Sequence, residues 1–267
     1  MKVIRTALLL SLGFGLLAPF TWAETPVPAK PPEPVSPPVV KAAPKMEDPT
    51  VPAIKGKAGP ENAFLKRHEA FLKDKTDILA KGPIQFLLVG DSITDGWRGK
   101  NGKETYDTAF GAYNPYNIGI GGDRTQHVLW RLDNGEVEAI KPKVAMLMIG
   151  TNNLGNALDE QIAAGITKCV EDLRSKLPNT KVLLLAVFPR SAKATDPFRA
   201  RLKNINETIK KLDDGGKTVK FLDIGDKFLD AEGNLPKDIM PDSLHPNAKG
   251  YAIWAEAVKP TLDEMMK

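Results

Sequence analysis

The stretch IQFLLVGDSITD, residues 84–95, sets a short apolar run directly before a glycine and a group of polar residues. Four more apolar runs of strand length follow along the chain, at residues 117–120, 144–149, 182–188 and 219–224. Runs that are short and apolar on both faces are typical of buried strands in a parallel sheet, because helices cover both sides of such a sheet. The five runs therefore predict a five-stranded parallel sheet.

Stretches of helical length separate these runs, as the crossovers of a parallel sheet require. Helices are expected at residues 64–79, 125–140, 159–176, 197–213 and 246–266. Strands that alternate with helices of this length belong to the α/β class. We expect a three-layer α/β/α sandwich, and because no segment repeats, we expect one domain rather than two.

The first 60 residues differ in composition from the rest of the chain. Residues 1–23 combine a basic start, an apolar stretch and small residues before a cleavage point, which are the features of a secretory signal peptide. Eleven of the 22 prolines fall in residues 24–60, which predicts a proline-rich disordered tether. Residues 61–267 then form the globular domain. The expected localisation is periplasmic or extracellular, with an uncleaved N-terminal membrane anchor as the alternative.

The formal net charge of +4 is concentrated outside the domain. Residues 1–23 carry +2 and residues 24–60 carry +1, which leaves +1 for the remainder. A domain so close to neutral lacks the clustered basic face of nucleic-acid-binding proteins, so no nucleic-acid partner is expected. The tether can hold the domain near the cell envelope or be a passive leader, and its composition fits both.

Polar residues gather directly after three of the apolar runs and again before the last helix. They form the blocks GDSITD (90–95), GIGGD (119–123), GTNN (150–153) and DSLHP (242–246). In an open parallel sheet, sites form where the carboxyl ends of the strands meet their loops. The four blocks are therefore expected to meet at one edge of the sheet.

Two of the blocks have a structural explanation when each is taken alone. Residues 90–92 can be a helix start, since Asp and Ser are good N-caps. Residues 121–123 can be a tight turn or an anion cradle. A dinucleotide or P-loop phosphate site is disfavoured, because neither motif is complete.

The last block admits a metal as a further alternative. Asp242 and His245, three residues apart, can be a structural cap or two metal ligands. The other two histidines, His68 and His127, lie in apolar helical stretches, which favours packing or surface roles over ligation.

Taken together, the blocks supply the groups that acyl transfer needs. A serine hydroxyl needs a base to remove its proton, and an imidazole base needs a carboxylate to orient it. Ser92, His245 and Asp242 supply these three roles. The oxyanion of the tetrahedral intermediate needs donors placed in advance, and the candidates are the backbone N–H groups of Ser92 and Gly122 and the side-chain amide of Asn152.

The four blocks resemble those of the SGNH or GDSL hydrolases, a family named for Ser, Gly, Asn and His. All four occur in the family's order, as GDSITDGW, NIGIGGD, GTNN and DSLHP, and the likeness covers about residues 84–260. The resemblance implies a flavodoxin-like SGNH hydrolase fold, with the catalytic triad and the oxyanion hole assigned above. It also implies that neither a metal nor an organic cofactor takes part.

Within the family, residues 117–153 are most similar to the catalytic subunits of intracellular platelet-activating factor acetylhydrolase. In those subunits, small apolar residues beside the triad restrict the acyl group to acetyl. The matching positions here are Ile93, Thr151 and Leu244, so the resemblance implies a short-acyl pocket.

Two departures limit how much of the resemblance carries over. Asn153 stands where many family members have Asp, although the acetylhydrolase subunits resemble this chain there. Residues 93–97 differ from those subunits, which are intracellular, whereas this chain has the marks of export. The substrate of those subunits is therefore not carried over by name.

The predicted function is an exported serine esterase for short-chain, principally acetyl, esters of carbohydrates or of small lipid-like alcohols. Five aromatic residues between the first two blocks can stack on sugar rings or fill the core; they are Trp97, Tyr106, Phe110, Tyr113 and Tyr116. The alternative function is a non-catalytic module that binds glycan or cell wall and keeps the SGNH fold. The partner in the first case is a glycan or small-molecule ester. The sequence leaves the oligomeric state open, and a homodimer is compatible with the pairing of the acetylhydrolase subunits.

Overall fold

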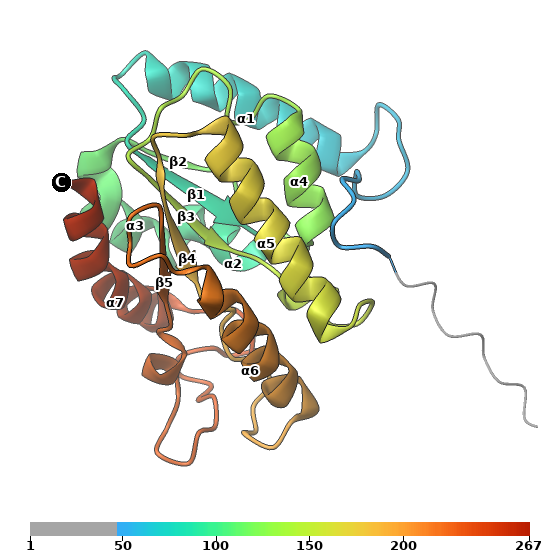
Figure 1. Cartoon of the computed structure of the whole chain (residues 1–267). Helices are drawn as coiled ribbons and strands as arrows, with labels where there is room; N and C mark the ends of the chain where they lie inside the picture. The colour runs from blue at the N-terminus through green and yellow to red at the C-terminus, as the bar shows by residue number, and fades with distance from the viewer. Residues whose placement is uncertain (1–46) are drawn as a thin grey trace, which may run out of the picture. The chain divides into compact units, whose positions relative to one another are not determined.

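A computed structural model describes residues 47–267 and contains a five-stranded sheet (Figure 1). The strands are β1 (Phe86–Gly90), β2 (Pro115–Asn117), β3 (Val144–Met148), β4 (Lys181–Leu185) and β5 (Val219–Leu222). Their order is β2-β1-β3-β4-β5, and every neighbouring pair is parallel. The predicted five-stranded parallel sheet is confirmed. Its order reverses beside β1, so β1 ends at the point where such sheets usually carry a site.

Helices cover both faces of this sheet. They are α1 (Ala63–Leu79), α2 (Ser92–Asp95), α3 (Lys103–Phe110), α4 (Thr125–Asp133), α5 (Asp159–Lys176), α6 (Pro197–Ile209) and α7 (Ala248–Met266). Helices α1, α4, α5 and α6 pack on one face, and α3 and α7 pack on the other (Figure 1). The predicted three-layer α/β/α sandwich is therefore confirmed.

The strands read as continuous apolar runs because both of their faces are buried. In β1, Leu87 and Val89 point into the core beneath α4 and α5, whereas Phe86 and Leu88 point into the core beneath α3 and α7. All four side chains have no exposed surface. Side chains alternate across a strand, so an apolar residue at every position supplies both cores.

Several elements differ from their predicted bounds; β4 ends at Leu185 instead of residue 188, and α6 ends at Ile209 instead of residue 213. Strand β2 begins two residues before the expected run 117–120 and ends at Asn117. The chain still runs beside β1 after this point, because the N–H of Ile118 donates to the Leu88 carbonyl at 2.9 Å. Helix α4 ends at Asp133 instead of residue 140, because Gly135 takes a left-handed conformation at φ 93°. Helix α3 was not expected, since its eight residues carry few apolar side chains.

The aromatic residues between the first two blocks belong to the core rather than to a sugar platform. Trp97, Tyr106, Phe110 and Tyr116 are buried, and Tyr113 is half-buried, with its hydroxyl donating to Asp263. Trp97 packs against Trp254 of α7 with ring centroids 4.8 Å apart. They therefore stabilise the sandwich and are not free to stack on a substrate.

The predicted domain boundary at residue 61 needs a correction. Residues 47–55, assigned to the tether, lie against the domain and form hydrogen bonds with the start of α4. Proline removes backbone donors, but its carbonyl still accepts, so an extended proline-containing segment can dock. Residues 24–46 and the signal segment 1–23 lie outside the described residues. Within residues 47–267, no helix is both long and apolar enough to cross a membrane.

Candidate active site

The Gly90-Asp91-Ser92 turn places Ser92 at the start of α2, directly after β1. A Cβ on Gly90 would lie 2.1 Å from Thr94 Oγ1 and 2.6 Å from the Met148 carbonyl oxygen, so only glycine fits. Asp91 caps the helix, since its Oδ1 accepts from the Ile93 N–H at 3.0 Å. Residues 90–92 are therefore a helix start, as one interpretation of the sequence predicted. The turn places Ser92 at the edge of the sheet.

Ser92, His245 and Asp242 form one continuous chain of hydrogen bonds. The Ser92 hydroxyl lies 2.8 Å from His245 Nε2, and His245 Nδ1 lies 2.6 Å from Asp242 Oδ2. Asp242 Oδ1 also accepts from the backbone N–H of His245 at 2.7 Å. This geometry lets Nδ1–H donate to the carboxylate, which leaves Nε2 free to accept the serine proton.

The carboxyl of Asp242 is held in its ionised form. Partial burial acts to raise the pKa of Asp242, but hydrogen bonds from the His245 ring and backbone and from the Leu244 N–H outweigh it and lower that pKa. An ionised carboxylate beside the ring favours the imidazolium that would form when His245 accepts a proton.

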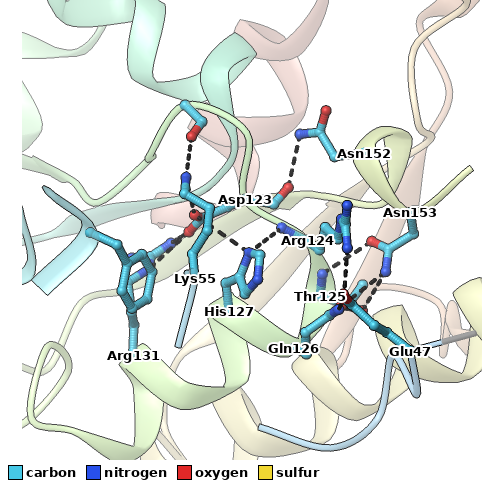
Figure 2. A network of polar contacts seen from close by, with 12 residues as sticks. Glu47, Lys55, Asp123, Arg124, Thr125, Gln126, His127, Arg131, Asn152 and Asn153 are labelled. Carbon is cyan, nitrogen blue, oxygen red and sulfur yellow. Dashed lines mark hydrogen bonds and ion pairs between the residues drawn. The ribbon is translucent and has the colours of Figure 1, made fainter. Parts of the chain in front are cut away.

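The Gly121-Gly122 turn lies beside Ser92. A Cβ on Gly121 would lie 3.9 Å from the Ser92 Cβ, and Gly122 has φ 74°, a conformation that favours glycine. Asn152 reaches the same turn from the end of β3, where its Nδ2 donates to the Asp123 carbonyl at 2.8 Å (Figure 2). One hydrogen of that amide remains for another acceptor.

The three candidate acyl-pocket residues flank these loops. Ile93 and Thr151 are buried, and Leu244 is half-buried. Arg190 fixes Thr151, because its Nη1 lies 3.1 Å from the Thr151 carbonyl and 3.2 Å from its hydroxyl. The buried Ile93 and the fixed Thr151 would limit the space for an acyl chain.

Asn153, which departs from the expected Asp, uses both ends of its side-chain amide. Its Oδ1 accepts from the Thr125 N–H at 3.1 Å, and its Nδ2 donates to Gln126 Oε1 at 3.0 Å. A carboxylate cannot donate, so Asp at this position would lose the second bond. The departure from the family pattern therefore leaves the GTNN loop tied to α4.

The sequence interpretation missed a buried ionic network behind the Gly122 turn, of which Figure 2 shows the Arg131–Asp123 pair. Arg131 is fully buried and binds Asp123 at 2.9 Å and Glu136 at 2.5 Å. His68 Nδ1 lies 2.8 Å from the second oxygen of Glu136. The four residues are spread over about 70 positions of the chain, and the sequence holds no signal that they pair. The network fixes Asp123, the residue that follows Gly122.

The histidines outside the triad serve the packing. His127 Nδ1 accepts from the Arg124 N–H at 3.0 Å, and burial together with Lys55 and Arg124 lowers the pKa of His127 to about 4, so its ring is neutral. His68 stands edge-on to Trp130 at 5.1 Å. Among residues 47–267, no group of three or more His, Cys, Asp or Glu side chains could hold a metal ion.

A hollow of about 780 Å³ opens next to the turn. Gly122, Arg124 and His127 line one side of it, and residues from Glu47 to Gly56 line the other. Charged side chains, such as Lys55 and Arg124, share this lining with apolar ones, such as Val51 and Ile54.

Asp91→Asn is expected to stabilise the protein increasingly as pH rises. Burial, assisted by the charge of Asp123, raises the pKa of Asp91 from 3.8 to about 7. As pH rises, Asp91 loses its proton at a lower pH in the unfolded chain than in the folded protein. This group therefore lowers the free energy of unfolding between about pH 4 and pH 7. The variant keeps the Oδ1 that caps α2 but has no charge to bury, and at about 1.4 kcal/mol per pKa unit it gains about 4 kcal/mol at pH 8. Melting temperatures at pH 5 and pH 8 measure this, and a difference that is the same at both values would contradict it.

Comparisons with known proteins identify the family. The GDSL-like lipase/acylhydrolase family model matches residues 88–253. Platelet-activating factor acetylhydrolase IB subunit alpha2 of Rattus norvegicus is 35% identical over 192 residues, which cover 72% of this chain and 80% of that protein. The alpha1 subunit of Homo sapiens is 33% identical over 191 residues, covering 72% and 79%.

Solved structures share the fold at lower identity. A GDSL-like lipase from Bacteroides thetaiotaomicron superposes with a TM-score of 0.58 at 21% identity, covering 74% of this chain and 98% of that one. A mutant of an acetylxylan esterase from Geobacillus stearothermophilus superposes with a TM-score of 0.55 at 20% identity, covering 68% and 93%. The chain belongs to the GDSL-like lipase/acylhydrolase family and is a hydrolase of ester bonds.

Proposed function

We propose that this protein is an exported serine esterase that removes short acyl groups, principally acetyl, with Ser92 as nucleophile. The observation that carries the proposal is the unbroken contact chain from Ser92 through His245 to Asp242, with distances of 2.8 and 2.6 Å. A serine, an imidazole and a carboxylate in this order are the parts of a general-base-activated nucleophile. The family membership supports the same reaction class.

In the first step, Ser92 Oγ attacks the acyl carbon while His245 Nε2 takes the hydroxyl proton. Negative charge then develops on the former carbonyl oxygen. The N–H groups of Ser92 and Gly122 and the free amide hydrogen of Asn152 are the donors proposed to stabilise it. The tetrahedral intermediate collapses when the protonated His245 gives its proton to the departing alcohol oxygen.

In the second step, water replaces the alcohol. His245 removes a proton from the water, whose oxygen attacks the acyl carbon of the Ser92 ester. The same donors stabilise the second oxyanion, and collapse returns the proton to Ser92 Oγ and releases the carboxylic acid. Asp242 stays ionised throughout and orients the ring.

The acyl preference is the first test of this proposal. With Ile93 and Thr151 buried and Leu244 half-buried beside the site, p-nitrophenyl acetate is expected to be hydrolysed with a kcat/KM at least about 10² above that of the decanoate. Leu244→Ala opens the half-buried wall and is expected to narrow this ratio. Comparable turnover of the two esters by the unaltered protein would exclude a short-acyl pocket.

For the alcohol part we propose a carbohydrate or a small lipid-like ester. The relatives named above as acetylhydrolases support the acetyl group, and the hollow on the Gly122 side has both charged and apolar lining residues, which would suit a hydroxyl-rich and a lipid-like alcohol respectively. Acetate release from a panel of O-acetylated glycans and acetylated lipids separates the two classes. Export through residues 1–23, and envelope association through the following tether, belong to the same proposal and are tested by fractionating cells that express the full chain.

A further inference from the structure

Residues 47–55, here called the N-terminal strap, are fastened along the start of α4. Glu47 accepts from Arg124 at 2.6 Å and from Gln126 at 2.7 Å (Figure 2). The Pro49 carbonyl accepts from the Thr125 hydroxyl at 2.8 Å, and the Ala53 N–H donates to the Gln126 carbonyl at 3.0 Å. These contacts carry the strap to the Gly121-Gly122 turn.

The strap ends in a cation placed on that turn. Lys55 Nζ donates to the Gly121 carbonyl and lies 3.3 Å from Asp123 Oδ1 (Figure 2). Its side chain keeps 33% of its surface exposed, and a Cβ on Gly122 would lie 3.6 Å from Nζ. The ammonium therefore lies against the backbone of the candidate oxyanion donor.

The carbonyl that Lys55 binds belongs to the same peptide unit as the N–H of Gly122. In a trans peptide the C=O and N–H groups point in opposite directions, so a cation on the carbonyl fixes the direction of the N–H. A charged donor on the oxygen also polarises the unit, because hydrogen bonds in a chain strengthen one another. The N–H of Gly122 becomes both better aimed and a stronger donor.

Lys55 also lies near the contact between the two loops that carry candidate oxyanion donors, the Gly121-Gly122 turn and the GTNN loop. Its second partner, Asp123, is held from behind by Arg131 and accepts from Asn152 at its carbonyl. The positive charge thus balances a buried carboxylate between the Gly122 turn and the GTNN loop. A lysine that merely anchored the strap would need neither of these contacts, since Glu47 and the residues after it already hold the strap to α4.

We propose that Lys55 is a positioning residue of the oxyanion hole, which acts through the Gly121–Gly122 peptide to orient and polarise the Gly122 N–H. The inference rests on the proposed function, because it assigns the Gly122 N–H to the oxyanion. It also gives the strap a part in the reaction, although the strap lies outside the four blocks.

Lys55→Met in the full chain is expected to lower kcat for p-nitrophenyl acetate about tenfold, less than the 10² to 10³ that loss of a donor costs. The KM should stay within about twofold, because the contact matters in the transition state. Affinity for phenylboronic acid, whose serine adduct carries an oxyanion-like oxygen, should fall with kcat. Lys57→Met is the control, since Lys57 is exposed and its backbone carbonyl, which the substitution keeps, accepts from Asn62; its kcat, KM and boronic acid affinity should be unchanged.

Lys55→Cys allows the effect of the positive charge on kcat to be separated from any effect of the substitution on folding. Cys169, the sole natural cysteine, is buried, and burial raises the pKa of its thiol, so an alkylating agent would modify position 55. Alkylation with 2-bromoethylamine restores an ammonium of nearly lysine length and should recover most of kcat. Alkylation with iodoacetamide adds a neutral amide and should not. Lys55→Arg should recover part of the loss.

Three outcomes would overturn the inference. They are an unchanged kcat in Lys55→Met, equal recovery with both alkylating agents, and a kcat loss without loss of boronic acid affinity. Failure of the proposed function would give a different result. Full activity in Ser92→Ala would show that Ser92 is not the nucleophile, independently of the results for the Lys55 variants.

Discussion

Ser92→Ala is expected to yield a folded protein whose esterase activity falls by about 10⁶-fold, to background. The Ser92 hydroxyl supplies the atom that forms the bond to the acyl carbon, and it is the group that contacts His245 Nε2. The fold should survive, because Asp91 rather than Ser92 caps α2 and the serine side chain is half-buried. Melting temperature and hydrolysis of p-nitrophenyl acetate measure the two expectations.

A fluorophosphonate probe supplies the second measurement for this variant. The probe should label the unaltered protein at Ser92 and leave Ser92→Ala unlabelled. Ser175→Ala, a substitution at an exposed position of α5, is the matched control and should keep both activity and labelling. Activity retained by a clean preparation of Ser92→Ala would remove Ser92 from the mechanism. Glycan binding by an unaltered protein that takes no label would instead favour the non-catalytic binding module.

The sheet could be predicted from the sequence because its strands are buried on both faces. A run such as residues 144–149 has no polar position, and few structures other than a covered parallel strand tolerate that. The helix boundaries were harder to predict from the sequence than the strands. The end of α4 depends on Gly135 with its positive φ, whereas the apolar pattern extends to Val137 and Ile140, which join the same core without being helical.

The site could be predicted only as far as the chemistry of single residues reaches. Ser92, His245 and Asp242 are recognisable because acyl transfer needs these three types, and the sheet brings them to one edge. The strap was missed because proline density is a signal of extended chain and holds no information on what that chain contacts. Likewise, the pairing of Arg131 with Asp123 depends on the α4 geometry and on burial, neither of which composition reveals.

Asn152→Ala is expected to lower kcat by about 10² to 10³ while KM for p-nitrophenyl acetate stays within a few-fold. The Asn152 amide has one hydrogen on the Asp123 carbonyl at 2.8 Å, which aims the amide, and the other is free for the oxyanion. An interaction formed only in the transition state lowers kcat and leaves ground-state binding nearly intact. Steady-state kinetics on the purified variant separates the two parameters.

The stability cost of this substitution should be small beside its kinetic effect. Removal of the amide breaks one neutral hydrogen bond at a half-buried position, which costs about 1 kcal/mol, or about 2 to 4 °C in melting temperature for a domain of this size. Asn179→Ala removes the same group from an exposed loop after α5 and should change neither kcat nor KM. If Asn152→Ala raised KM and left kcat intact, the amide would hold the substrate rather than the oxyanion. A fall in kcat alone would place its hydrogen bond in the transition state, beside the Gly122 N–H that Lys55 is proposed to aim.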